Sequence, residues 1–80
     1  MLSPDRLYVH ETIGLGTVYR AMNNLPRGTM LTGHNVAAHL DTMYGAQFLG
    51  GHIPPPLLRA IETVVNQERA AMMQQTEMVI

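Results

Sequence analysis

The feature that most constrains this chain is its last third, which follows three consecutive prolines and contains no glycine or proline of its own. The prolines at 54–56 form a stiff extended entry, and Pro56 can serve as the first residue of a helix. From Leu57 to about Met78, apolar residues recur with the i, i+3, i+4, i+7 spacing of an amphipathic helix. Those apolar positions are Leu57, Leu58, Ile61, Val64, Val65, Ala71, Met72 and Met78. The sequence therefore predicts one long C-terminal helix with an apolar stripe that must pack against something.

The predicted helix is too long for the domain that carries it. At 1.5 Å per residue it measures roughly 33 Å, whereas a compact chain of this size has a diameter of about 30 Å. Residues 57–65 can pack on the domain's own core, but the part past Glu68 cannot. Glu68 occupies a stripe position where an apolar residue is expected. We expect this carboxylate to pair with Arg69 or with an arginine of a partner, or to mark where the stripe leaves the core.

The segment beyond Glu68 is rich in methionine, a flexible and polarizable side chain that is common at binding surfaces. An apolar C-terminus left in water would be a liability. We therefore predict that this distal part is an oligomerisation or docking segment, the alternative being that it folds back on its own domain. The predicted partner-binding residues are Glu68, Arg69, Met72, Met73, Met78 and Ile80.

Shorter helices are predicted before the prolines. Ser3, followed by proline and aspartate, is typical of a helix start, because the serine caps free backbone N–H groups and the acid suits the positive end of the helix dipole. Residues 7–11 fit either a helix or a strand. Glycines at 14 and 16 interrupt the regular secondary structure. Helical spacing follows from Thr17 to Asn24, and one face of this helix is formed by Val18, Ala21, Met22 and Leu25.

A further helix is predicted after residue 28. Thr29 or Thr32 can cap it, and Tyr44 with the following glycine can end it. Phe48 is the only phenylalanine and is expected to anchor the next loop to the core. The apolar face of this helix is predicted to consist of Val36, Ala37, Leu40 and Met43.

These elements predict a small all-α fold of three or four helices, with the C-terminal helix longest. We expect a single domain over residues 1–80, with its core in residues 1–68 and the distal part of helix 57–78 outside it.

Charged residues make up 14% of the chain, all five cations are arginine, and cysteine is absent. Typical proteins have about 25% charged residues. A surface poor in charge is easier to bury in an interface, and the missing cysteines exclude disulfides and thiolate metal sites.

The residues that could carry chemistry are scattered. His34 and His39 are five positions apart and do not share a helix face, and neither His10 nor His52 adds a zinc-binding spacing. The six acidic residues form no pair typical of acid–base catalysis, and the glycines at 14 and 16 lack a third glycine. We therefore expect no enzyme activity, no metal site, no cofactor and no small-molecule substrate.

One segment suggests an alternative. Residues 13–25, which include Thr17-Val18-Tyr19-Arg20, resemble the recognition-helix segment of the ferric uptake regulator family. The resemblance covers about thirteen residues and implies a small helix-turn-helix transcriptional regulator in which Thr17, Tyr19 and Arg20 face DNA. The helical pattern at 36–43 stands where that family has a β-hairpin wing. The other interpretation is an ordinary amphipathic helix, which the net charge of −1 favours because it provides no basic patch.

Together these features favour a non-enzymatic interaction or assembly protein. We expect a subunit of a homo-oligomer, or a small component of a larger complex such as a phage particle or an inhibited target. No run of 18 apolar residues and no secretory signal are found in the sequence. The chain is therefore expected in the cytoplasm or in a particle assembled there, with protein partners, no membrane partner, and nucleic acid as the alternative.

Overall fold

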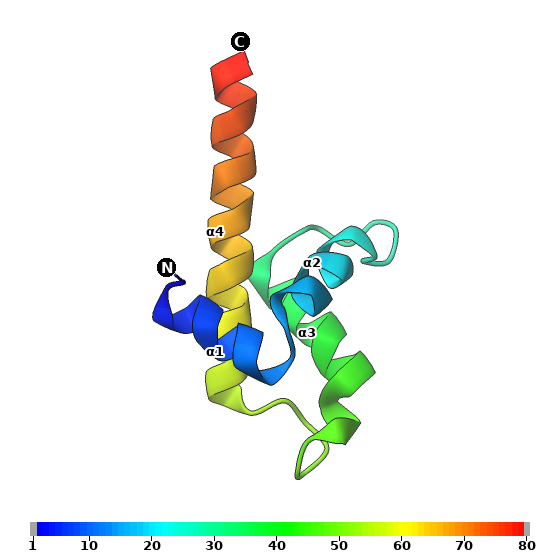
Figure 1. Ribbon diagram of the computed structural model, residues 1–80. Helices are drawn as coiled ribbons and strands as arrows, with labels where there is room; N and C mark the ends of the chain where they lie inside the picture. Colours follow the sequence, from blue (N-terminus) through cyan, green and yellow to red (C-terminus); the bar gives the residue numbers. More distant parts are fainter. Residues whose placement is uncertain (1, 80) are drawn as a thin grey trace.

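A computed structural model describes residues 2–79, with side chains described up to Met73. Within this range the chain is all-α, as predicted, and contains no strand (Figure 1). The elements are α1 (Pro4–Thr12), α2 (Leu15–Asn23), α3 (Gly33–Tyr44), a single 3-10 turn η1 (Gly45–Gln47) and α4 (Pro55–Val79). The prediction of a long C-terminal helix is thereby confirmed.

The helix α4 is the element on which the others assemble. Both α1 and α3 pack along its first half, and α2 contacts α1, α3 and α4. The second half of α4 extends beyond the other helices (Figure 1). The core lies where the four helices meet and consists of Val9, Val18, Ala21, Val36, Ala37, Leu40, Ile53, Leu57, Ala60, Ile61, Val64 and Val65.

The N-terminal segment is a helix, which settles the choice between helix and strand at residues 7–11. The Ser3 hydroxyl accepts a hydrogen bond from the Arg6 backbone N–H at 3.3 Å, and Pro4 opens the helix as expected. Val9 is the one buried residue of α1, and it faces the core. The helix ends because Gly14 adopts a φ of 87°, a left-handed conformation that favours glycine, and α2 starts at the next residue.

The start of α3 is held tightly against α4. Thr32, one of the two predicted caps, accepts a hydrogen bond from the Asn35 N–H at 3.0 Å. The next residue, Gly33, donates its N–H to the Asn66 side chain of α4 at 3.2 Å. A Cβ atom at Gly33 would lie 2.7 Å from the carbonyl oxygen of Glu62, so only glycine allows this approach. The helix backbones are therefore in direct contact at this point.

The last part of α3 is joined through Asp41 to the loop that leads into α4. Its carboxylate accepts a hydrogen bond from the Ile53 N–H at 2.7 Å and lies 3.2 Å from the His52 ring. These two hydrogen bonds, the backbone one first, lower the pKa of Asp41 below its ordinary value of 3.8. Phe48 is half-buried and packs against the core, as expected for an anchor of this loop.

Two predictions about residue placement are wrong. Met43 is predicted on the buried face of α3 but is 57% exposed, because it lines an open groove between α2 and α3. Pro56 was expected to open the C-terminal helix, but α4 begins at Pro55. Both Leu57 and Leu58 donate their N–H groups to the carbonyl of Pro54, so this residue caps the helix through its backbone.

We predict that Gly33→Ala destabilises the fold. The new Cβ would overlap the backbone of α4 and force the helices apart, which costs roughly 1–3 kcal/mol. Chemical denaturation should detect the change. The matched control is Gly16→Ala in α2, where a Cβ meets nothing closer than 3.7 Å. That variant should stabilise the protein by up to about 1 kcal/mol through helix propensity. Equal stabilities for the two variants would contradict the proposed close contact.

We also predict that Asp41 makes the fold sensitive to acid. Because its folded-state pKa is lowered, the carboxylate contributes stability above its ordinary pKa, and that contribution is lost as the pH falls through the folded-state pKa. Thermal melts below about pH 4 should therefore show a falling midpoint. In Asp41→Asn the amide still accepts from Ile53 but does not ionise. Its melting midpoint should fall less over the same window, and an identical fall in both proteins would refute the assignment.

Candidate functional site

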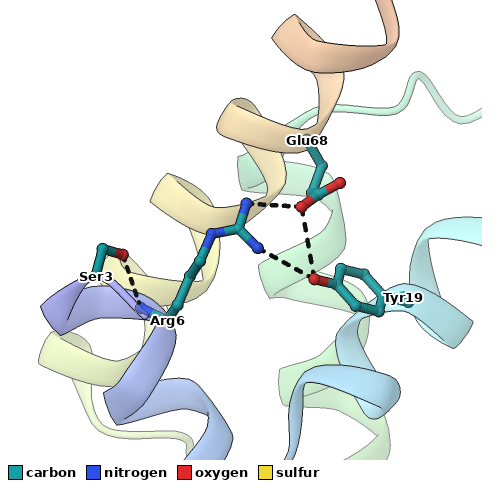
Figure 2. A network of polar contacts seen from close by, with 4 residues as sticks. All are labelled: Ser3, Arg6, Tyr19 and Glu68. Atoms are coloured by element: carbon teal, nitrogen blue, oxygen red, sulfur yellow. Dashed lines mark hydrogen bonds and ion pairs between the residues drawn. The ribbon is translucent and has the colours of Figure 1, made fainter. Parts of the chain in front are cut away.

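A network of polar side chains joins α1, α2 and α4 at the place where α4 leaves the core (Figure 2). The Arg6 guanidinium forms an ion pair with Glu68, with 2.6 Å between Nη2 and Oε1. Arg6 also donates from Nη1 to the Tyr19 hydroxyl at 3.1 Å, and that hydroxyl donates to Glu68 at 3.5 Å. The hydrogen bond that Arg6 donates to Glu68 is the main cause that raises the pKa of Arg6. We refer to Arg6, Tyr19 and Glu68 as the tie.

The tie corrects one part of the expectation for Glu68. Its carboxylate pairs with Arg6 of the same chain, 62 positions away, and not with Arg69. Glu68 also stands just after the last buried position described in α4, in agreement with the expectation that it marks where the stripe leaves the core. Arg69 is half-buried, whereas Met72 and Met73 are 51% and 63% exposed. The two remaining predicted partner-binding residues, Met78 and Ile80, lie outside the described side chains. Of the predicted contact surface beyond Glu68, the structure therefore describes only the side chains of residues 69–73.

The three residues that the regulator resemblance assigns to DNA are used differently from one another. The Tyr19 hydroxyl is directed at α1 and α4, and the ring remains 37% exposed. The Thr17 hydroxyl donates to the Ile13 carbonyl at 2.8 Å and accepts from Arg20 Nη2 at 3.3 Å. Arg20 is exposed and has no acidic partner among the described residues. Of the three, Arg20 is the only charged side chain, and its charge is free to interact with a phosphate group.

The histidines do not converge. His52 lies against Asp41, and His34 lies 3.8 Å from Glu62 on the surface. In the described part of the chain, no three side chains of histidine, cysteine or acidic residues gather at one point. The same residues include no helix with the length and apolar character of a membrane span.

We predict that the Arg6–Glu68 pair stabilises the domain measurably. The side chains are 21% and 30% exposed, so a double-mutant cycle with Arg6→Met and Glu68→Gln should give a coupling of about 1 kcal/mol that shrinks at high salt. The control cycle uses His34 and Glu62, which are 84% and 38% exposed and 3.8 Å apart. It should give no measurable coupling. If the Arg6–Glu68 cycle also gave no measurable coupling, the tie would contribute nothing to stability.

Comparison with protein-family models, with curated proteins and with solved structures finds no match to this chain. The resemblance to the ferric uptake regulator family therefore rests on residues 13–25 alone, and the functional argument depends on the geometry described above.

Proposed function

We propose that this protein is a non-enzymatic assembly component that associates with a second copy of itself through the distal part of α4. The observation that carries the proposal is the position of residues 70–73. All four are exposed, although they belong to a regular helix that is anchored in the core a few residues earlier. This is the segment that the sequence pattern assigns to docking.

The dimensions of the molecule support this division of α4. Among the residues whose side chains are described, which end at Met73, Val65 is the last buried one, and the helix continues to Val79. Fourteen further residues correspond to about 21 Å of helix. The radius of gyration is 13.0 Å, compared with about 11.6 Å for a compact chain of this length. The extra length lies in α4, which projects past the other helices (Figure 1).

The chemistry of the distal segment favours a second copy as the occupant. Residues 70–80 contain a single charged residue, Glu77, and five large apolar residues: Met72, Met73, Met78, Val79 and Ile80. Two such segments can approach without strong repulsion, because each brings one charge. An antiparallel pair centred on Met73 would bring position 69 of one chain level with position 77 of the other. The sequence has arginine at the first position and glutamate at the second, so the charges are complementary.

We predict that one substitution unfolds the domain and another separates its copies. Ile61→Asp places a charge in the fully buried core and should unfold the chain. Met72→Asp combined with Met73→Asp should leave the helical circular dichroism intact and convert the associated form to monomers. Light scattering after size exclusion, over a range of protein concentrations, measures this change.

The matched control is Met30→Asp, because Met30 is 71% exposed on the α2–α3 loop and offers the same chemistry outside α4. It should associate like the wild type. A wild-type chain that stays monomeric at every concentration would refute the proposal. Unfolding of the Met72/Met73 double variant would show instead that the distal segment stabilises the domain.

A further inference from the structure

A groove lies between α2 and α3, on elements that the proposed association does not use. It encloses about 260 Å³, and its apolar lining consists of the exposed side chain of Met43 above the buried residues Ala21 and Leu40. The exposure of Met43, which the sequence pattern did not predict, arises here because Met43 stands at the wall of this groove and not in the core. An apolar lining on a concave surface is typical of a small-molecule site.

Polar side chains with unused hydrogen-bonding groups surround this groove. They are Arg20, Asn24, His39 and Tyr44. Arg20 bonds to Thr17 within the lining, and the side chains of the other three make no hydrogen bond to any described residue. No acidic side chain belongs to the lining. The groove therefore combines one cation that has no acidic partner in the described part of the chain, Arg20, with several side chains that can form hydrogen bonds.

The ion pairs elsewhere in the molecule contrast with the groove, where the basic side chains have no acidic neighbour within the described range. Arg6 is paired with Glu68, His34 lies near Glu62, and His52 lies against Asp41. Arg20 and His39 share a cavity and have no carboxylate against them among the described residues. A guanidinium in this position can bind an oxyanion with two parallel hydrogen bonds.

The groove continues past this charged end. A second hollow of about 330 Å³ shares Thr17 and Tyr44 with the first and extends to Phe48. Its lining contains no charged residue. A ligand with an anionic group and an apolar body would thus place the anion at Arg20 and direct its body along Tyr44 toward the second hollow.

We propose that this groove binds a small amphiphilic anion, with a phosphate or carboxylate held by Arg20 and His39 and an apolar body lying against Met43 and Tyr44. The probe that tests it is phenyl phosphate, titrated into the full chain and followed by calorimetry and by amide chemical shifts. The shifts should concentrate on α2 and on the second half of α3. Inorganic phosphate should bind about tenfold more weakly because it buries no apolar surface. Phenol should also bind more weakly because it lacks the charge, and benzoate reports whether a carboxylate suffices.

The variants separate a built site from a general attraction between charges. Arg20→Gln should weaken phenyl phosphate binding about tenfold, and His39→Gln should weaken it to a smaller degree. Arg59→Gln removes the same charge from an exposed position of α4 that is outside the groove lining, so it should bind like the wild type. Thermal melts of all three variants should match the wild type, because none of these side chains is buried.

Several outcomes would overturn the proposal. Equal losses in Arg20→Gln and Arg59→Gln would show attraction by net charge alone. Shifts that fall outside α2 and α3, or no binding at millimolar phenyl phosphate, would show that the groove is not a site. Salt-sensitive binding of duplex DNA that requires Arg20, without binding of phenyl phosphate, would assign Arg20 to nucleic acid, as the regulator resemblance implies.

Discussion

The structure depends on the burial of one face of α4, from Leu57 to Val65, beneath α1 and α3. An 80-residue chain without disulfides has few means of stabilisation beyond such a face, because its surface is large relative to its core. Gly33 makes the packing close, since its missing side chain lets the start of α3 touch the backbone of α4. Val9 of α1 and Val18 of α2 complete the same core from the other side. Each short helix is therefore stabilised mainly by what it covers, and not by its own length.

Much of this fold could be predicted from the sequence because its signals are local. The spacing of apolar residues predicts α4, and the capping residue Ser3 predicts the start of α1. The start of α3 is predicted at one of two caps, of which the structure uses Thr32. Where local signals conflict, the pattern could not decide. The β-branched and aromatic residues at 8–12 favour a strand, but the capped start and the burial of Val9 against α4 make this segment a helix. Helical spacing also places Met43 on the same face of α3 as Leu40, yet it cannot show that α2 and α3 leave an open groove at Met43.

The contacts that define the candidate sites could not be predicted in the same way, because they join residues far apart in the sequence. Glu68 was recognised as an anomaly in the apolar stripe, but its partner, Arg6, lies 62 positions earlier and becomes available only when α1 packs beside α4. The groove has the same origin. Arg20 and His39 occupy ordinary surface positions of two separate helices, and the space between them appears when α2 is laid against α3.

The tie lies at the boundary between the buried part and the exposed part of α4. A carboxylate in an apolar stripe must be paired or solvated, and here Arg6 of α1 and Tyr19 of α2 supply the partners. Packing of further apolar residues on the domain would require another element beyond this level, and the described chain contains none there. After Glu68 and the half-buried Arg69, residues 70–73 of the helix are exposed. The buried residues that stabilise the fold therefore precede Glu68, and the association that we propose would draw its free energy from the exposed residues that follow.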